Sequence, residues 1–223
     1  MKKQINIPNK QKDFKLWQYQ ELLKIADPTA ADVVRLLLDV DKATVDSIAL
    51  NDVNELASTM MEGINAKPKF KPTFTLNGQE FGFIPKLDAI TWGENGDLVK
   101  YINETETAHR AMAVMFRPIT TKRKEKYLIE DYGGTEAYAE LMRNAPLSAY
   151  LGARVFFYNL MNELLLSTLS YMEKEEAKLT TSPKNGEAIR KHINSLRGIL
   201  EPLTQSTNNH YTNAYSYSPL KAT

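Results

Sequence analysis

The stretch NAPLSAYLGARVFFYNLMNELLLSTLSYME, residues 144–173, decides the fold because it predicts one long helix. Apolar residues recur at the three- and four-residue spacing of a buried helical face, and a second apolar stripe covers much of the remaining surface. The first stripe is Leu151, Val155, Tyr158, Leu165, Leu169 and Met172, and the second is Phe156, Phe157, Leu160, Met161, Leu164 and Leu166. A helix that is apolar on most sides must be surrounded by other elements. We therefore expect this helix to lie at the centre of the fold.

Shorter amphipathic helices are predicted around this central helix. Their expected ranges are 14–25, 27–40, 42–48, 51–64, 91–102, 107–116, 135–142 and 187–200. Asp27-Pro28, Asn51-Asp52, Thr91 and Thr135 are the residues at which we expect four of them to begin, and Thr91 with Glu94 has the spacing of a capping box.

A β-hairpin is the clearest short-range signal in the chain. Asn77-Gly78 lies between two runs rich in phenylalanine, and this dipeptide favours a two-residue type I′ turn. A further short strand is expected at 127–129, after an exposed basic turn at 121–126. The predicted class is α+β and predominantly α-helical, with helices around the long central helix (about 145–173) and a small antiparallel β-hairpin sheet.

The composition divides the chain into three parts. Residues 1–66 are predicted to form an N-terminal arm and a helical subdomain, and residues 67–204 the β-hairpin and the helical core. The tail at 205–223 is rich in Asn, Ser, Thr and Tyr, and its tyrosines Tyr211, Tyr215 and Tyr217 fit a flexible segment and a partner-docking peptide equally well.

Charge and composition exclude several classes of protein. The chain has 28 Lys and Arg against 27 Asp and Glu, so no overall field favours nucleic acid. The absence of cysteine excludes disulfides and thiolate zinc sites. No secretory signal is expected, because no apolar segment follows the basic start. A membrane span is not expected either, because the apolar run at 155–169 is short and contains Asn159, Asn162 and Glu163.

The residues reveal no recognised catalytic, cofactor-binding or metal-binding constellation, and we predict none. His109, His192 and His210 lie on separate elements, whereas a metal site needs ligands that converge. No serine has the Gly-x-Ser-x-Gly context of a nucleophile, and the glycines match no phosphate-binding pattern.

Two groups of polar residues remain as candidates. Asn162 and Glu163 interrupt the apolar surface of the central helix. A carboxylate in an apolar setting could act as an acid. The favoured interpretation is structural, with Asn162 fixing helix register or oligomeric state and Glu163 pairing with an arginine. The basic stretches Lys67–Lys71 and Lys122–Lys126 could contact phosphate groups, although solvated turns are favoured.

Three segments resemble proteins of Bacteroidetes tailed phages, including crAss-like phages. They are FTLNGQEFGFIPKLDAITWGENGDLVKYI (74–102), AHRAMAVMFRPIT (108–120) and APLSAYLGARVFFYNLMNELL (145–165). The resemblance covers about residues 70–170 and contains no enzymatic signature.

The resemblance implies a non-enzymatic virion protein, associated with the tail or the head–tail barrel. One version of this role is an internal cargo protein that is released with the DNA. The implied partners are other virion proteins (tail barrel, portal or ring proteins), with a homo-oligomer as a further option, and no specific nucleic acid. A tail assembly chaperone is the alternative, and a small phage enzyme with a clustered polar pocket is third.

Overall fold

The computed structural model of the chain describes residues 7–124, 126–178 and 193–194. The chain forms two compact units, and the boundary between them lies between Ala153 and Arg154. The predicted boundary between residues 66 and 67 falls inside the first unit. The predicted tail at 205–223 and most of the predicted helix at 187–200 lie outside the described residues.

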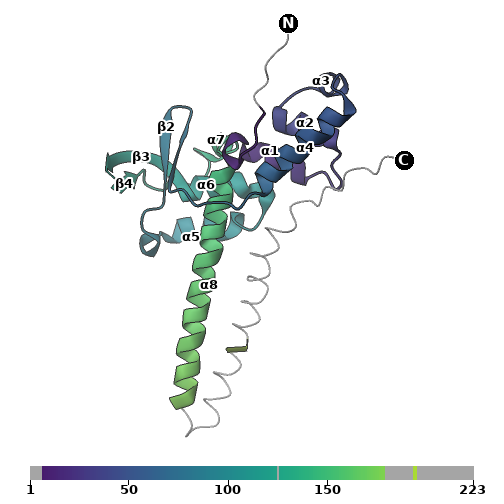
Figure 1. The fold of residues 1–223 in the computed structure, drawn as a ribbon. Helices are drawn as coiled ribbons and strands as arrows, with labels where there is room; N and C mark the ends of the chain where they lie inside the picture. Colours follow the sequence, from purple (N-terminus) through teal and green to yellow (C-terminus); the bar gives the residue numbers. More distant parts are fainter. Residues whose placement is uncertain (1–6, 125, 179–192, 195–223) are drawn as a thin grey trace. The chain divides into compact units, whose positions relative to one another are not determined.

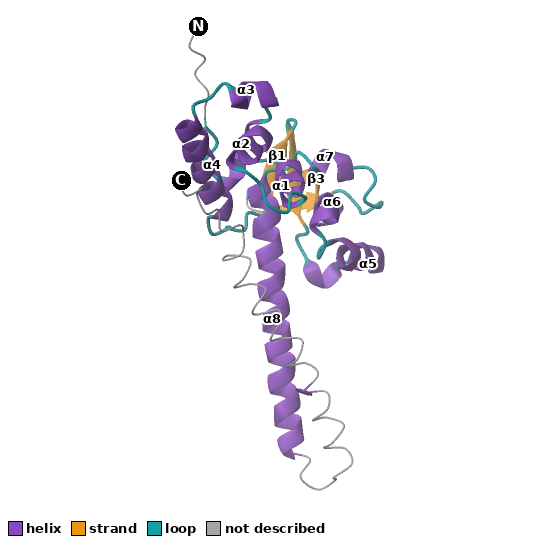
Figure 2. Ribbon diagram, turned by 90° about the vertical axis from the view of Figure 1, so that its right-hand side faces the viewer, coloured by secondary structure: helices purple, strands orange, loops and turns teal. Residues whose placement is uncertain are grey.

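The predicted α+β, mostly helical class is confirmed. The described helices are α1 (Leu16–Leu23), α2 (Ala30–Leu38), α3 (Lys42–Asp46), α4 (Leu50–Asn65), α5 (Trp92–Tyr101), α6 (Ala108–Met115), α7 (Ala139–Met142) and α8 (Leu147–Lys178), with 3-10 turns η1 (Gln11–Asp13), η2 (Leu87–Ala89) and η3 (Thr105–Thr107). The described strands are β1 (Thr73–Leu76), β2 (Gln79–Phe83), β3 (Phe116–Arg123) and β4 (Lys126–Ile129). In the first unit, α2, α3 and α4 gather on one side, and α5 lies on the other (Figures 1 and 2).

Local capping chemistry determines where several helices begin. At α5 the predicted capping box is confirmed, because the Thr91 hydroxyl accepts from the Glu94 N–H and the Glu94 carboxylate accepts from the Thr91 N–H. The start predicted for α2 at Asp27-Pro28 is wrong. Thr29 caps this helix, since Asp32 completes a capping box three residues later.

Three other predicted boundaries are wrong. Helix α4 begins at Leu50, so Asn51-Asp52 lie within its first turn, where an acidic side chain favours the helix N-terminus. The helix expected from Thr135 is shortened to α7, four residues long. Helix α6 runs directly into β3, so the predicted basic turn at 121–126 is largely strand, with Lys124 at the connection.

The sheet contains more strands than the sequence predicts. The Asn77-Gly78 turn is confirmed, and both residues have positive φ (50° and 80°). The described strands form an antiparallel sheet in the order β1-β2-β3-β4. Strand β3 joins the predicted hairpin because Phe116 pairs with Phe83 and Pro118 with Phe81. Aromatic packing stabilises this arrangement, with the Phe116 ring centroid 5.3 Å from that of Phe83.

Helix α8 is buried at its start. Leu147, Ala149, Tyr150 and Ala153 are buried in the first unit. Farther along the helix, Leu169 is also buried, whereas Leu166 and Tyr171 are 54% and 65% exposed. Leu166 was part of the predicted apolar stripes, so at this position the helical pattern predicted burial that the structure does not show.

Buried glutamine side chains join the N-terminal helices to the rest of the first unit. Gln11 Nε2 donates to the carbonyl oxygens of Ile64 and Ala66 at the end of α4. Gln18 Nε2 donates to Leu36 O (3.1 Å) and Leu37 O (3.0 Å) at the end of α2. The last carbonyls of a helix lack partners within the helix, so these amides satisfy them from neighbouring elements.

Candidate functional site

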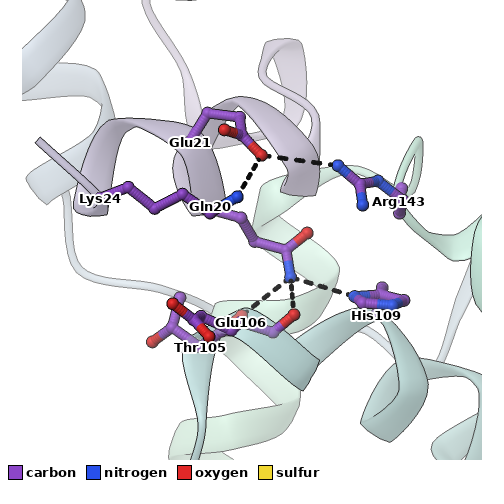
Figure 3. Close-up of polar contacts among 7 residues, drawn as sticks. All are labelled: Gln20, Glu21, Lys24, Thr105, Glu106, His109 and Arg143. Carbon is purple, nitrogen blue, oxygen red and sulfur yellow. Dashed lines mark hydrogen bonds and ion pairs between the residues drawn. The ribbon is translucent and has the colours of Figure 1, made fainter.

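A third buried glutamine, Gln20, lies at the base of a polar pocket between α1 and the start of α6. Its Nε2 donates to Thr105 O (2.8 Å) and Glu106 O (2.9 Å), and lies 3.1 Å from His109 Nδ1 (Figure 3). An amide nitrogen has two hydrogens, so three acceptors share two donors. These contacts attach α1 to η3 and α6.

The imidazole of His109 is buried next to this amide. Burial is the largest effect that lowers the pKa of His109 below its usual value, because it disfavours the charged ring. The positive charge of Arg143 also lowers this pKa. The ring is therefore neutral at pH 7, and its Nδ1 can accept a hydrogen from Gln20.

Charged residues surround the mouth of the pocket. Glu21 Oε1 lies 2.7 Å from Lys24 Nζ and 3.6 Å from Arg143 Nη2, and Glu106 completes the lining (Figure 3). The volume of the pocket is about 280 Å³. With two cations and two carboxylates, the lining has no net charge.

One buried acceptor in the pocket has no partner among the described residues. Gln20 Oε1 is fully covered and accepts no described hydrogen bond. A buried unpaired acceptor costs about 1–3 kcal/mol relative to a paired one. Because the atom is covered, this acceptor belongs to the packing beneath the pocket, and the groups that the pocket presents are the charged side chains at its mouth.

A second buried polar cluster joins α5 to β3. The Glu94 carboxylate and the Arg117 guanidinium form an ion pair in which both side chains are less than a tenth exposed (5% and 8%). The guanidinium lies 5.4 Å from the centre of the Tyr132 ring, and the Tyr132 hydroxyl donates to Asp97 Oδ2 (2.5 Å). The ion pair joins α5 to β3, and the Tyr132 hydrogen bond attaches the segment after β4 to α5, so the cluster holds elements together.

Of the residues considered from the sequence, His109 contacts Gln20, and none of them is among the described residues that line the pocket. Glu163 is exposed, so it is not the buried carboxylate that the sequence allowed. Asn162 is half-buried on α8. His192, His210 and the tail tyrosines lie outside the described residues, and the basic stretches flank β1 and form the β3–β4 connection.

Sequence reasoning missed Gln20, Arg117 and Arg143. A glutamine among apolar helical residues gives no signal of its partners, because the acceptors of Gln20 are 85 and 86 positions away. The capping-box pattern identified Glu94 in the sequence, but this pattern does not reveal that Glu94 also pairs with Arg117 in a later strand.

The neutral buried imidazole predicts a pH dependence of stability. Since the folded-state pKa of His109 is lowered from 6.5, its contribution is complete above about pH 6.5 and is lost as the pH falls below that value. Replacing His109 with Gln removes the titration. We expect the melting temperature of the variant to fall less than that of the parent between about pH 7.5 and about pH 5. If the melting temperatures of the parent and the variant changed equally with pH, His109 would not be the source of the pH dependence.

Two searches of the described residues give negative results. Of the helices that the structure describes, none combines the length and apolar character needed to cross a membrane. In the same part of the chain, no group of three or more His, Cys, Asp or Glu side chains could hold a metal ion.

Comparison of the chain with protein-family models, with curated proteins and with solved structures found no match.

Proposed function

We propose that this chain is a non-enzymatic virion protein of a tailed phage, associated with the tail or the head–tail barrel. The observation that supports the proposal is that residues of the three phage-like segments form the packed framework of the fold. These segments supply β1 and β2, α5, α6 with the start of β3, and the start of α8. The segments therefore specify a packed framework.

Particular residues of these segments have packing roles. Asn77-Gly78 forms the hairpin turn, Glu94 pairs with Arg117 across two segments, and Gly152 lets α8 approach the backbone of Lys69. A protein that is selected for its shape and contacts needs such residues. The polar pocket at Gln20 lies largely outside the segments, so the resemblance does not extend to a binding site.

An exposed apolar face within the same segments supports a role in assembly. Trp92 and Val99 lie seven residues apart on α5, so they share one helical face, and they are 90% and 64% exposed. Gly96 lies between them, and the space beside it is open. Tryptophan is enriched among the residues that dominate binding energy at protein interfaces. We assign this face to contact with a neighbouring virion protein.

The same face favours one alternative, a tail assembly chaperone. A chaperone binds structural proteins through exposed apolar surface and leaves before the particle is complete. The internal cargo role is a version of the first proposal, in which the protein stays until the DNA is ejected.

Quantitative mass spectrometry of purified particles of the encoding phage tests these proposals. A fixed ratio to the portal protein is the expected result for a virion component. Loss of the protein from particles that have ejected their DNA would identify cargo. Its absence from intact particles, with presence in infected cells, would overturn the virion proposal and favour the chaperone.

The α5 face has its own test. Replacing Trp92 with Ala should leave the melting temperature nearly unchanged, because exposed substitutions usually have small effects on stability. We expect this variant to be depleted from purified particles. The matched control is Leu50→Ala, an exposed apolar residue (72%) outside the phage-like segments, which should be incorporated normally. Equal incorporation of both variants would contradict the role of the face.

A further inference from the structure

Helix α5 has an exposed side that is nearly free of charge. The exposed residues of this helix are Trp92, Gly93, Asn95, Gly96, Val99 and Lys100, so one of the six is charged. The acidic residues Glu94 and Asp97 instead contact partners within the first unit. Charged residues usually cover the exposed side of a helix, whereas they are depleted at the centres of protein interfaces. The exposed side of α5 therefore has the composition of an interface centre.

Asn95 extends the α5 face, which is then defined as Trp92, Asn95, Gly96 and Val99. Trp92 and Val99 lie along one line on the helix, because the residues between them complete nearly two turns. Asn95 and Gly96 flank this line on opposite sides, since each residue turns the helix by about 100°. In Figure 2, α5 lies at the outer edge of the first unit. The face is a small, mostly apolar patch with one side-chain amide.

The α5 face is complementary to a second copy of itself. An antiparallel pair of α5 helices would have its two-fold axis midway between Asn95 and Gly96. Trp92 of each copy then lies against Val99 of the other copy, because both residues are equally far from the axis. Asn95 lies beside the same residue of the other copy, and an amide can pair with its own copy because it contains both donors and an acceptor. Gly96 also meets its own copy, where the missing side chains let the helices approach.

Charge favours a second copy over a charged partner. The α5 face contains no charged side chain that would select an acidic or a basic surface. The chain has a net charge of +1, so two copies repel each other only weakly. An antiparallel pair also places opposite ends of the two helix dipoles next to each other. Dimers of one chain with two-fold symmetry are the commonest soluble oligomers.

We propose that two copies of this chain associate through the α5 face as an antiparallel pair with two-fold symmetry. The inference rests on the proposed function, because it identifies the neighbouring virion protein as a second copy. Two tryptophan side chains bury about 300–500 Å² in such a pair, whereas stable interfaces bury about 1,200–2,000 Å². We therefore expect a weak dimer, with a dissociation constant above about 1 µM.

Sedimentation velocity of the full chain, in a concentration series from about 1 µM to about 1 mM, tests the proposal. The parent protein should shift from monomer to dimer across the series. Trp92→Ala should weaken the dimer by about tenfold or more, because each copy loses a buried tryptophan. The matched control is Leu50→Ala, which removes another exposed apolar side chain and should dimerise like the parent.

Replacing Gly96 with Gln separates dimer formation from folding. No atom lies within 4 Å of an added Cβ at this position, and glutamine is a better helix former than glycine. The variant monomer should therefore be at least as stable as the parent. The longer side chain would hold the two helices apart, so we expect the variant to remain monomeric throughout the series. A Gly96→Gln protein that dimerises like the parent would contradict a close contact at this residue.

Cysteine cross-linking tests the position of the two-fold axis. The chain contains no cysteine, so Asn95→Cys introduces a single thiol. Its two copies lie beside the axis, and oxidation should give a disulfide-linked dimer. The matched control Asn103→Cys is also exposed, but its two copies would lie about 20 Å apart, too far for a disulfide. Equal cross-linking of the two variants would contradict the proposed pairing.

Failure of this inference differs from failure of the proposed function. A parent protein that stays monomeric up to about 1 mM, or a Trp92→Ala variant that dimerises like the parent, would overturn the second copy as the partner. If Trp92→Ala were still depleted from purified particles, the α5 face would contact a different virion protein. A dimer that forms through α5 in a protein absent from the particles would contradict the virion proposal and leave the pairing intact.

Discussion

Replacing Arg117 with Met is expected to lower the free energy of unfolding by about 3–5 kcal/mol. The substitution leaves the Glu94 carboxylate buried without its cation, and the penalty for an uncompensated buried charge is large. It also removes the guanidinium from the face of the Tyr132 ring. Chemical denaturation of the parent and the variant measures the difference.

Two further variants show whether the loss comes from the buried pair. Lys42→Met removes one partner of the exposed Lys42–Asp46 pair, and we expect little change because water screens such pairs. The double variant Glu94→Gln/Arg117→Met should lose about 1–3 kcal/mol less than the sum of its single variants. Additive losses would show that the two side chains do not interact.

The same pair predicts a loss of stability in acid. Burial raises the pKa of Glu94, but the hydrogen bonds from Thr91 and the Arg117 guanidinium outweigh burial, so the pKa is lower than its usual value of 4.5. A lowered carboxyl pKa stabilises the fold above about pH 4.5, and this contribution is lost as the pH falls through the folded-state pKa. The Glu94→Gln variant should lack this part of the pH dependence.

Replacing Gly152 with Ala is expected to destabilise the first unit by about 1–3 kcal/mol. A Cβ atom at this position would lie 2.7 Å from Lys69 O and 3.0 Å from the Phe70 Cα. Both atoms belong to the backbone, so relief requires α8 or the segment before β1 to move. Thermal and chemical denaturation measure the loss.

The control uses the same substitution at a glycine with free space. Gly96 lies in α5 with no atom within 4 Å of an added Cβ. Alanine there should stabilise the protein by about 0.5–1 kcal/mol, because glycine has more conformational freedom to lose in a helix. If both variants gain stability, the close approach at Gly152 does not constrain the packing.

Local signals in the sequence were sufficient for several elements. Asn77-Gly78 predicted the hairpin turn because few residues tolerate its positive φ values. Thr91 and Glu94 predicted the start of α5, since both capping hydrogen bonds form within four residues. The helical spacing from Leu151 predicted a helix over about 145–173, and α8 runs from Leu147 to Lys178.

The sequence by itself determined the class of the fold, the hairpin and most of the helices, because these depend on residues that are close along the chain. Only the tertiary structure decided that β3 extends the sheet, that Arg117 neutralises Glu94, and that Gln20 meets carbonyls of η3. Helical periodicity also could not show that Leu166 on α8 is exposed whereas Leu169 is buried. The hydrophobic pattern of a sequence shows which residues could be buried. Which of these residues are buried depends on partners that are distant in the sequence, because those contacts form only when the chain has folded.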